Sequence, residues 1–573
     1  MTINVDQDGQ QAIVSFPRYW IAMIFVLLTL FITLDEFRYP ETLGLSSSNV
    51  ATVPLFNAWT IGWNADRFAN RFADYWNAPI FFPAHNSFAF SEPQPATLLV
   101  SPIVLATGSF IVGYKAYLVL SLFLNGLFAA LLLSRLGYHW TLQILGGIGI
   151  LLLPIIHERI DVIQLLPVWG ILWFWSSLFE LMERPSFSRS VWLGLSYAVC
   201  FTLCIHHSLF LTILTTLSSV VFLPKLFNWS RLLWISIAVL MGSLMVLPLV
   251  LPIHKATKEH NFSRQEELVI HLSAHPVDYL NSQSNSVIKF AAFEGSPSRQ
   301  FCVGWIKMLL AIVGLISGII TKQRRQWILF LFMTGLFAFF LSLGPSFHIG
   351  ELNPWQLLSR HSPGMSQVRS AYRFAWFVQI AVAFLAIEGL RGLFQFYVRY
   401  KSRRSLQLSL GFLLLILSIL FVGETWPEKT VRADIPAFDK NEKWIEYLRT
   451  NKSQQAAIAC FPFANGKLVN DFEKTTRWMC YGLKHETPMV NGYSGFFPEE
   501  YLRIAKLFEN HDTEVAGIER LSELGVSHLV VSQQYSTSDV MLRLKSPRYS
   551  LEHVFADQSA AVDIYRLDVT ELE

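Results

Sequence analysis

Long apolar runs separated by short polar loops dominate the first three quarters of the chain. The hydrocarbon core of a bilayer is about 30 Å thick, so a helix that crosses it needs about 20 mostly apolar residues. Runs of roughly this length lie near residues 19–34, 114–135, 141–156, 162–182, 190–206, 208–224, 232–252, 303–320, 327–343, 374–396 and 405–422. The pattern predicts a polytopic α-helical membrane protein with about eleven transmembrane helices.

One further apolar run, residues 96–111, is ambiguous because it is short and contains Pro102 and Gly108. The distribution of basic residues decides its assignment, because short cytoplasmic loops are enriched in Lys and Arg. If the run does not cross, the short loops on the N-terminal side carry Arg135, Arg184, Arg189, Lys225, Arg231, Lys322, Arg324, Arg325, Arg399, Lys401, Arg403 and Arg404. The opposite short loops then carry only Arg159. We therefore expect a cytoplasmic N-terminus and a juxtamembrane or re-entrant segment at 96–111.

Three long loops, 35–113, 254–302 and 344–373, fall on the non-cytoplasmic side in this orientation. Residues 423–573 fall on the same side and hold 17 Lys/Arg and 23 Asp/Glu, whereas the longer segment 1–422 holds only 28 and 19. The chain is therefore predicted to divide into a multi-span membrane domain, 1–422, and a charged extracytoplasmic domain.

Strand and helix signals alternate in the charged C-terminal segment. The pattern predicts a buried strand at residues 456–463, a second strand at 527–534, helical stretches between them and a hairpin at the end of the chain. This pattern predicts a small α/β domain. Cys460 and Cys480 lie within it, where an extracytoplasmic disulfide is permitted, but the sequence does not show that they meet.

Composition supports a membrane protein and disfavours several other classes. Hydrophobic residues make up 52% of the chain and charged residues 15%, whereas soluble domains carry about 25% charged residues. The net charge of +3 is too small to indicate nucleic-acid binding. The sequence has no P-loop motif, which argues against a pump with its own nucleotide site.

The first long loop brings several acidic residues to the expected membrane boundary. Asp35 and Glu36 follow the first span directly, and Asp74 and Glu92 lie in the aromatic-rich stretch 57–95. Carboxylates at a membrane boundary are costly unless solvated or paired, which makes them functional candidates. The aromatic residues suit both stacking on sugar rings and anchoring of a juxtamembrane helix pair in the headgroups, and the sequence leaves both readings open.

A second acidic cluster, Glu158 and Asp161, lies in the turn between two apolar spans, on the same expected side. His157 precedes it, but a zincin motif requires a second histidine four residues later and Asp161 occupies that position. We therefore expect no zinc site here. A polar turn with an internal ion pair to Arg159 is the simpler alternative.

Some arginines lie on the expected outer side, although short cytoplasmic loops carry most of the Lys and Arg. These outer arginines are candidates for phosphate binding. Arg369 and Arg373 lie four residues apart, so on a helix they would share a face. Guanidinium groups bind phosphate through forked hydrogen bonds; snorkelling at a helix end is the alternative. His206 and His207 form a predicted polar turn that would orient a phosphate, act as an acid, or serve only as a turn.

The order of several segments resembles the GT-C superfamily of integral-membrane glycosyltransferases, and more narrowly a bacterial branch near the YfhO-like membrane proteins. The matching segments are NAW (57–59), DYWNAPIFFP…FAFSEPQ (74–94), PIIHERIDVIQLLPVWG (154–170), PGMSQVRSAYRF (363–374) and VNGYSGFFPEEY (490–501). The resemblance implies a bacterial inner (cytoplasmic) membrane protein that moves a sugar from a polyprenyl-phosphate-linked donor. The acceptor would be an extracytoplasmic glycan, lipid or protein of the cell envelope.

The resemblance also assigns roles to individual residues. An acid of the first outer loop, Asp35 or Glu36, would act as base or hold a metal. The matching acid of the second acidic outer loop would be Glu158 or Asp161. Asp74 and Glu92 lie inside the best-matching segment and compete for the role of base. The first loop departs from the superfamily because it lacks an Asp-x-Asp motif, so we assign no metal ligands and leave dependence on a divalent metal open.

Under this interpretation Arg369 and Arg373, with His206 and His207, would hold the lipid phosphate.

The sequence leaves two alternative functions open. The first is a flippase for lipid-linked glycans, which should carry polar residues through several spans, whereas mid-span charges are sparse here. The second is a non-catalytic envelope-assembly protein that retains the GT-C fold.

Overall fold

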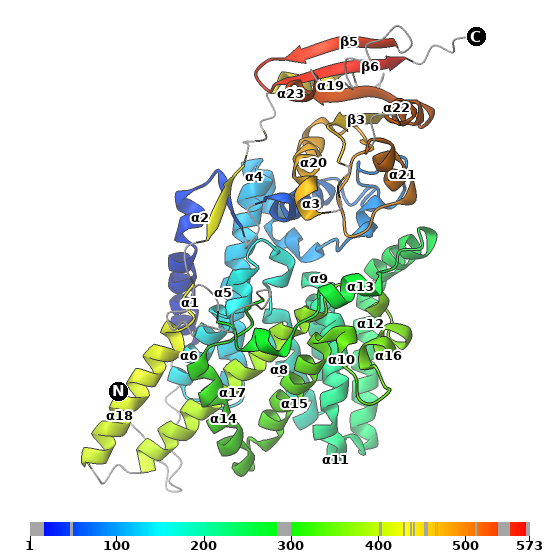
Figure 1. The fold of residues 1–573 in the computed structure, drawn as a ribbon. Coiled ribbons are helices and arrows are strands. Elements are labelled where there is room, and N and C mark those ends of the chain that lie inside the picture. The colour runs from blue at the N-terminus through cyan, green and yellow to red at the C-terminus, as the bar shows by residue number, and fades with distance from the viewer. Residues whose placement is uncertain are drawn as a thin grey trace. The chain divides into compact units, whose positions relative to one another are not determined.

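The computed structural model describes residues 17–45, 50–282, 299–399, 404–427, 430–435, 438, 442–451, 457–464, 466, 468–509, 513–536 and 550–568. The described residues form two compact units (Figure 1). The first, here called the helical unit, draws on Met1–Arg38, Leu118–Leu247 and Ser263–Thr430. The second, here called the mixed unit, draws on Tyr39–Tyr117, Pro248–Phe262 and Val431–Glu573.

The helical unit consists mainly of apolar helices. They are α1 (Arg18–Ile32), α2 (Leu34–Arg38), α5 (Phe110–Arg135) from Leu118 onward, α6 (Trp140–Leu151), α7 (Pro154–Glu158), α8 (Trp169–Glu183), α9 (Phe187–Leu203), α10 (Ile205–Ser218), α11 (Leu223–Leu226), α12 (Trp229–Glu259) up to Leu247, α13 (Glu266–His271), α14 (Trp305–Ile320), α15 (Arg325–Ser342), α16 (Pro354–His361), α17 (Ala375–Arg399) and α18 (Arg404–Gly423). Helix α17 packs against both α14 and α15 and lies at the centre of the unit (Figure 1).

Within the described residues, seven helical stretches are long and apolar enough to cross a membrane. They are Phe110–Arg135, Trp140–Glu158, Ile163–Glu183, Ile205–Leu226, Trp229–Glu259, Arg325–Ser342 and Ala371–Val398. They support a multi-pass membrane protein. The other expected spans coincide with the shorter apolar helices α1, α9, α14 and α18, so the total of eleven remains a prediction. The run 96–111 contains a 3-10 turn, Pro95–Val100, and the seven-residue helix α4 (Ser101–Thr107).

Close packing of α14 on α17 depends on two glycines. A Cβ at Gly314 would overlap the backbone oxygen of Leu385, and a Cβ at Gly389 would overlap the backbone oxygen of Leu310. Small residues allow helix backbones to approach closely, which is how helices associate in lipid. The two glycines therefore set the distance between α14 and α17.

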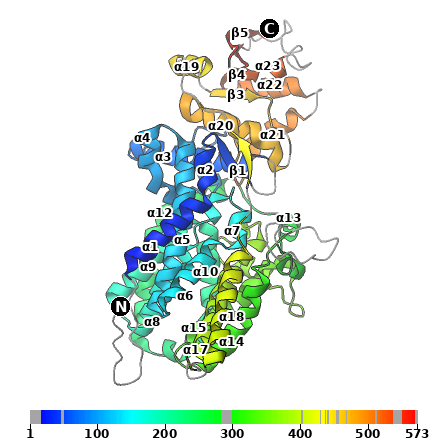
Figure 2. The same ribbon diagram turned by 90° about the vertical axis from the view of Figure 1, so that its left-hand side faces the viewer.

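The mixed unit combines helices with two sheets. Its elements are β1 (Thr42–Leu45), α3 (Thr52–Ala69), α4, β2 (Val431–Asp434), α19 (Lys443–Thr450), β3 (Ala457–Phe461), α20 (Glu473–His485), α21 (Glu499–Leu507), α22 (Glu514–Glu523), β4 (Val526–Ser532), α23 (Gln533–Ser536), β5 (Ser550–Asp557) and β6 (Val562–Asp568). The larger sheet has the order β3-β4-β6-β5, in which β3 and β4 are parallel and the other pairs antiparallel. Helix α22 packs against β4, and α19 packs against β5 (Figure 2).

The smaller sheet joins two distant parts of the sequence. Strands β1 and β2 pair antiparallel, with Thr42 opposite Asp434 and Leu45 opposite Val431. The segment after the first expected span is therefore part of the same compact unit as the C-terminal segment.

The two cysteines considered for a disulfide are buried free thiols in the structure. Cys460 lies on β3, and the Cys480 thiol on α20 donates to the backbone oxygen of Leu55 at 3.7 Å. Burial raises the pKa of both thiols, so each behaves as a small apolar core residue.

Candidate functional site

Three arginines of the helical unit meet around Tyr372, which is 9% exposed. The guanidinium carbons of Arg159 and Arg299 lie 5.5 Å and 5.0 Å from the centroid of the Tyr372 ring. The Arg373 side chain hydrogen-bonds the side chain of Tyr372 and is itself only 8% exposed. We call Arg159, Arg299 and Arg373 the arginine cluster.

Carboxylates accompany the arginine cluster. Glu158 lies 3.4 Å from the Arg159 guanidinium, and Asp161, three residues further along the same turn, is only 3% exposed. Burial lowers the pKa of Arg159, but Tyr372 and the two acids outweigh burial and hold the pKa above its ordinary value. Asp278 also lies near Arg299, and burial raises the pKa of its carboxyl. The cluster therefore places positive and negative groups side by side.

Two donors of the arginine cluster are buried without an acceptor. Among the residues that the structure describes, the Nε atoms of Arg159 and Arg373 have no hydrogen-bond partner. Buried donors are nearly always satisfied, and each exception calls for an explanation such as an absent ligand. Because both donors belong to guanidinium groups, an anion is the complementary ligand.

A buried glutamine on α17 holds the loops that carry the cluster. The Gln379 side chain accepts a hydrogen bond from the backbone N–H of Ile155 at 3.2 Å and donates to the backbone oxygen of Phe301 at 3.1 Å. It thus bridges the segment before Glu158 to the segment after Arg299. Sequence reasoning did not identify Gln379 because a single polar residue in an apolar run has no distinctive spacing.

Replacing this bridge should destabilise the helical unit. Gln379→Leu leaves a buried N–H and a buried carbonyl unsatisfied, so the free energy of unfolding should fall by about 2–4 kcal/mol. Thermal unfolding in detergent, followed by tryptophan fluorescence, measures the effect. Gln407→Leu is the control because Gln407 is half-buried and, among the described residues, its side chain makes a 3.4 Å contact with Tyr397. Equal midpoints for the two variants would contradict this role for Gln379.

The expected pairing of Arg369 and Arg373 on one helix face is wrong. Residues 368–370 are not helical and lie between two 3-10 turns, Met365–Gln367 and Ala371–Phe374. The backbone N–H of Tyr372 donates to the oxygen of Leu272 instead of to a helical carbonyl. The helical i, i+4 relation is therefore lost, and only Arg373 of the pair contributes to the arginine cluster.

Other predicted residues of the helical unit lie in different surroundings. Asp35 and Glu36 are on α2, where Asp35 pairs with Arg38 at 3.7 Å and Glu36 is buried. His206 and His207 lie in the first turn of α10, not in a loop. His207 is fully buried and packs against two aromatic rings of α17, those of Trp376 and Phe377.

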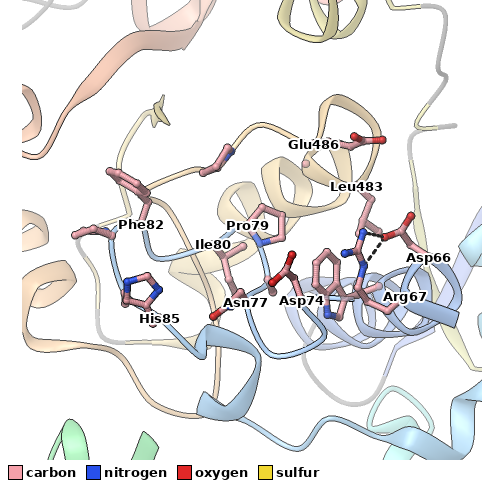
Figure 3. A pocket seen from close by; sticks show the side chains of 16 residues that line it. Asp66, Arg67, Asp74, Asn77, Pro79, Ile80, Phe82, His85, Leu483 and Glu486 are labelled. Carbon is pink, nitrogen blue, oxygen red and sulfur yellow. Dashed lines mark hydrogen bonds and ion pairs between the residues drawn. The ribbon is translucent and has the colours of Figure 1, made fainter. Parts of the chain in front are cut away.

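The remaining predicted acids, Asp74 and Glu92, belong to the mixed unit. Asp74 lines an open cavity of about 440 Å³ between the end of α3, the loop 70–86 and the end of α20 (Figure 3). Glu92 is half-buried and does not line this cavity. The cavity lining contains three carboxylates, one amide, one imidazole and one indole, supplied by Asp66, Asp74, Glu486, Asn77, His85 and Trp63.

A buried asparagine and a half-buried tyrosine fix the cavity loop on α3. Asn64 is fully buried and donates to the backbone oxygen of Pro93 at 2.9 Å and to the Thr97 hydroxyl at 2.8 Å. The Tyr75 hydroxyl donates to the Asn64 side chain at 2.8 Å, and the Trp63 indole N–H donates to the backbone oxygen of Tyr75 at 3.0 Å. These bonds make the cavity wall a fixed part of the mixed unit.

The structure brings together several residues that the sequence did not single out. Arg159 was noted as the lone basic residue of the short outer loops and as the ion-pair partner of the neighbouring acids, and its pair with Glu158 is present at 3.4 Å. Arg299 and Tyr372 had no such signal, since their neighbourhood depends on tertiary contacts. Glu486 of the C-terminal segment also had no such signal, since its place in the cavity lining depends on tertiary contacts.

Comparison with known proteins establishes the family and the fold. Residues 56–417 match the family described as "Domain of unknown function (DUF6311)". The chain belongs to this family. No curated protein sequence matches it at a significant level.

Two sets of solved structures share the fold of this DUF6311 protein. The first is the mycobacterial arabinofuranosyltransferase AftD, with a TM-score of 0.55 and 14% identity over 97% of this chain and 42% of that one. The second is the oligosaccharyltransferase AglB from the archaeon Archaeoglobus fulgidus, in complex with an inhibitory peptide and a dolichol-phosphate. It has a TM-score of 0.50 and 11% identity over 97% of this chain and 75% of that one.

Both neighbours are GT-C glycosyltransferases, and at 14% and 11% identity this chain shares their fold. The DUF6311 protein spans less than half the length of the mycobacterial chain. The narrower resemblance to YfhO-like proteins remains a prediction.

Proposed function

We propose that this DUF6311 protein is a membrane glycosyltransferase that moves a sugar from a polyprenyl-phosphate donor to an extracytoplasmic glycan, lipid or protein. The observation that carries the proposal is the arginine cluster, with two buried Nε donors beside the acids Glu158 and Asp161. The GT-C fold over nearly the whole chain supports it. The eleven spans, the cytoplasmic N-terminus and the outer C-terminal domain belong to the same proposal.

The transfer reaction needs a negatively charged base and positively charged phosphate-binding groups in the same site. The acceptor oxygen attacks the anomeric carbon as the bond from that carbon to the phosphate oxygen breaks. A carboxylate, Glu158 or Asp161, takes the acceptor proton, which is general base catalysis. The phosphate leaves with the bonding electron pair, and Arg159 and Arg373 stabilise its growing charge.

Lipid binding tests the phosphate role directly. Purified protein in nanodiscs should bind undecaprenyl phosphate at least about tenfold more tightly than undecaprenol, because only the phosphate satisfies buried guanidinium donors. Arg373→Gln and Arg159→Gln should remove most of this difference while leaving undecaprenol binding unchanged. Native mass spectrometry with both lipids in competition measures it.

The matched control is Arg360→Gln. Arg360 lies on α16 in the same outer loop and is exposed, so its removal should leave the preference for phosphate intact. Equal binding of the phosphate and the alcohol by the unaltered protein would refute the proposed role, as would an equal loss in the control variant.

A further inference from the structure

The cavity of the mixed unit has the composition of a carbohydrate site. Sugar hydroxyls both donate and accept, and carboxylates, amides and imidazoles match them. Asp74 and Asn77 offer such groups at the surface, and the half-buried ring of Phe82 offers apolar surface for the face of a sugar ring. A volume of about 440 Å³ is within the range of about 300–1,000 Å³ typical of small-molecule sites.

The charge of the cavity restricts the ligand. Its carboxylates come from Asp66, Asp74 and Glu486, and its single guanidinium is that of Arg67 (Figure 3). Arg67 is already engaged, since its Nε and Nη2 both donate to Asp66 Oδ2, at 2.8 Å and 2.5 Å. With three carboxylates and one guanidinium, the lining carries a net negative formal charge, which disfavours a phosphate or a uronic acid. A neutral or amine-bearing sugar is the complementary ligand.

Two of these acids have a left-handed backbone conformation, which glycine adopts most readily. Asp74 has φ 50° and Glu486 has φ 59°, both in the left-handed region. Glu486 follows the last residue of α20, a position at which glycine is preferred and at which a negative charge opposes the helix dipole. Residues that break local rules concentrate at functional sites, which agrees with a ligand role for these acids.

We propose that this cavity binds a neutral or amine-bearing sugar through Asp74, Asn77 and Glu486. This binding site is independent of the arginine cluster, whose charge suits the lipid phosphate. The further step, that the bound sugar belongs to the glycosyl acceptor, rests on the proposed transferase function.

Direct binding tests the site without any assay of transfer. The full chain is placed in nanodiscs free of glycoside detergent. Saturation-transfer NMR is then recorded with methyl glycosides of glucose, galactose, mannose, arabinose, glucosamine and N-acetylglucosamine, and with methyl glucuronide and glucose 1-phosphate. We expect at least one neutral or amino sugar to bind, and the two anionic probes to bind at least about tenfold more weakly. The proposal is overturned if no sugar of the panel binds, or if the anionic probes bind best.

Isosteric variants locate the binding. Asp74→Asn and Glu486→Gln should each weaken sugar binding by about tenfold, the size expected for one charged hydrogen bond. Glu41→Gln, which removes an exposed acid of the same unit outside the cavity, should leave it unchanged. Loss of binding in Glu41→Gln, or no loss in either cavity variant, contradicts the assignment.

Two further measurements distinguish a loss of sugar binding from a loss of stability and from the proposed transferase function. Glu486→Gly should raise the thermal unfolding midpoint and still weaken sugar binding, whereas a purely structural role predicts no loss of binding. Arg373→Gln should abolish the preference for undecaprenyl phosphate and retain sugar binding. Retained sugar binding without any phosphate preference in the unaltered protein would refute the transferase proposal while leaving the sugar site standing.

Discussion

Replacing Gly389 with alanine should lower the free energy of unfolding by about 3 kcal/mol, because the added methyl group has no space. A Cβ at this position would overlap the backbone oxygen of Leu310 and approach the backbone nitrogen of Gly314 to 3.2 Å. Backbone atoms of a packed helix cannot rotate away as a side chain can, so α14 and α17 must separate. Gly314→Ala should have a similar effect from the other side of the contact.

Thermal unfolding of the purified protein measures this effect. Gly423→Ala is the control, because a Cβ at Gly423 would meet no atom within 4 Å. The control should unfold at the temperature of the unaltered protein. An unchanged midpoint for Gly389→Ala would show that the two helices do not pack through these glycines.

Neutralising the acids beside the arginine cluster should have the largest effect on transfer. A positioned general base contributes about 10²- to 10⁴-fold to the rate. Either Glu158→Gln or Asp161→Asn should therefore reduce transfer of radiolabelled sugar from an extracted pool of lipid-linked sugars by at least about 10²-fold. The other variant should show the smaller loss expected of a group that only orients Arg159.

Lipid binding distinguishes loss of the base from loss of the site. Both amide variants should retain the preference for undecaprenyl phosphate over undecaprenol, since they leave the guanidinium groups in place. Asp35→Asn serves as a comparison, because Asp35 pairs with Arg38 on α2. If transfer survives in both Glu158→Gln and Asp161→Asn but fails in Asp35→Asn, the base lies in the first outer loop instead.

The sequence predicted the helices well because hydrophobic length is a local property. Every expected span coincides with a helix in the structure, including the short ones. The strands β3 and β4 and the final hairpin also lie where the sequence predicted strands. The helix boundary at Cys204, which places His206 and His207 inside α10, was less visible since an apolar run does not reveal a single extended residue.

The candidate site was predicted only in part, for reasons of tertiary structure. Glu158 and Asp161 were found because acids are rare between apolar spans. Arg299 was not found, because its distance from Tyr372 is set by the fold of two loops far apart in sequence. The assumed helix through Arg369 failed because neither its backbone nor that of Ser370 is helical.

The pairing of β1 with β2 has a consequence for how the protein is made. Strand β1 leaves the ribosome early, but its partner follows roughly 390 residues later, which at about 5–20 residues per second is a delay of about 20–80 s. During that interval β1 presents unpaired backbone donors and acceptors, and Leu43, which is fully buried in the finished protein, has no core to enter. The mixed unit is therefore completed only after the last apolar helix has been synthesised, and biogenesis must protect this strand until then.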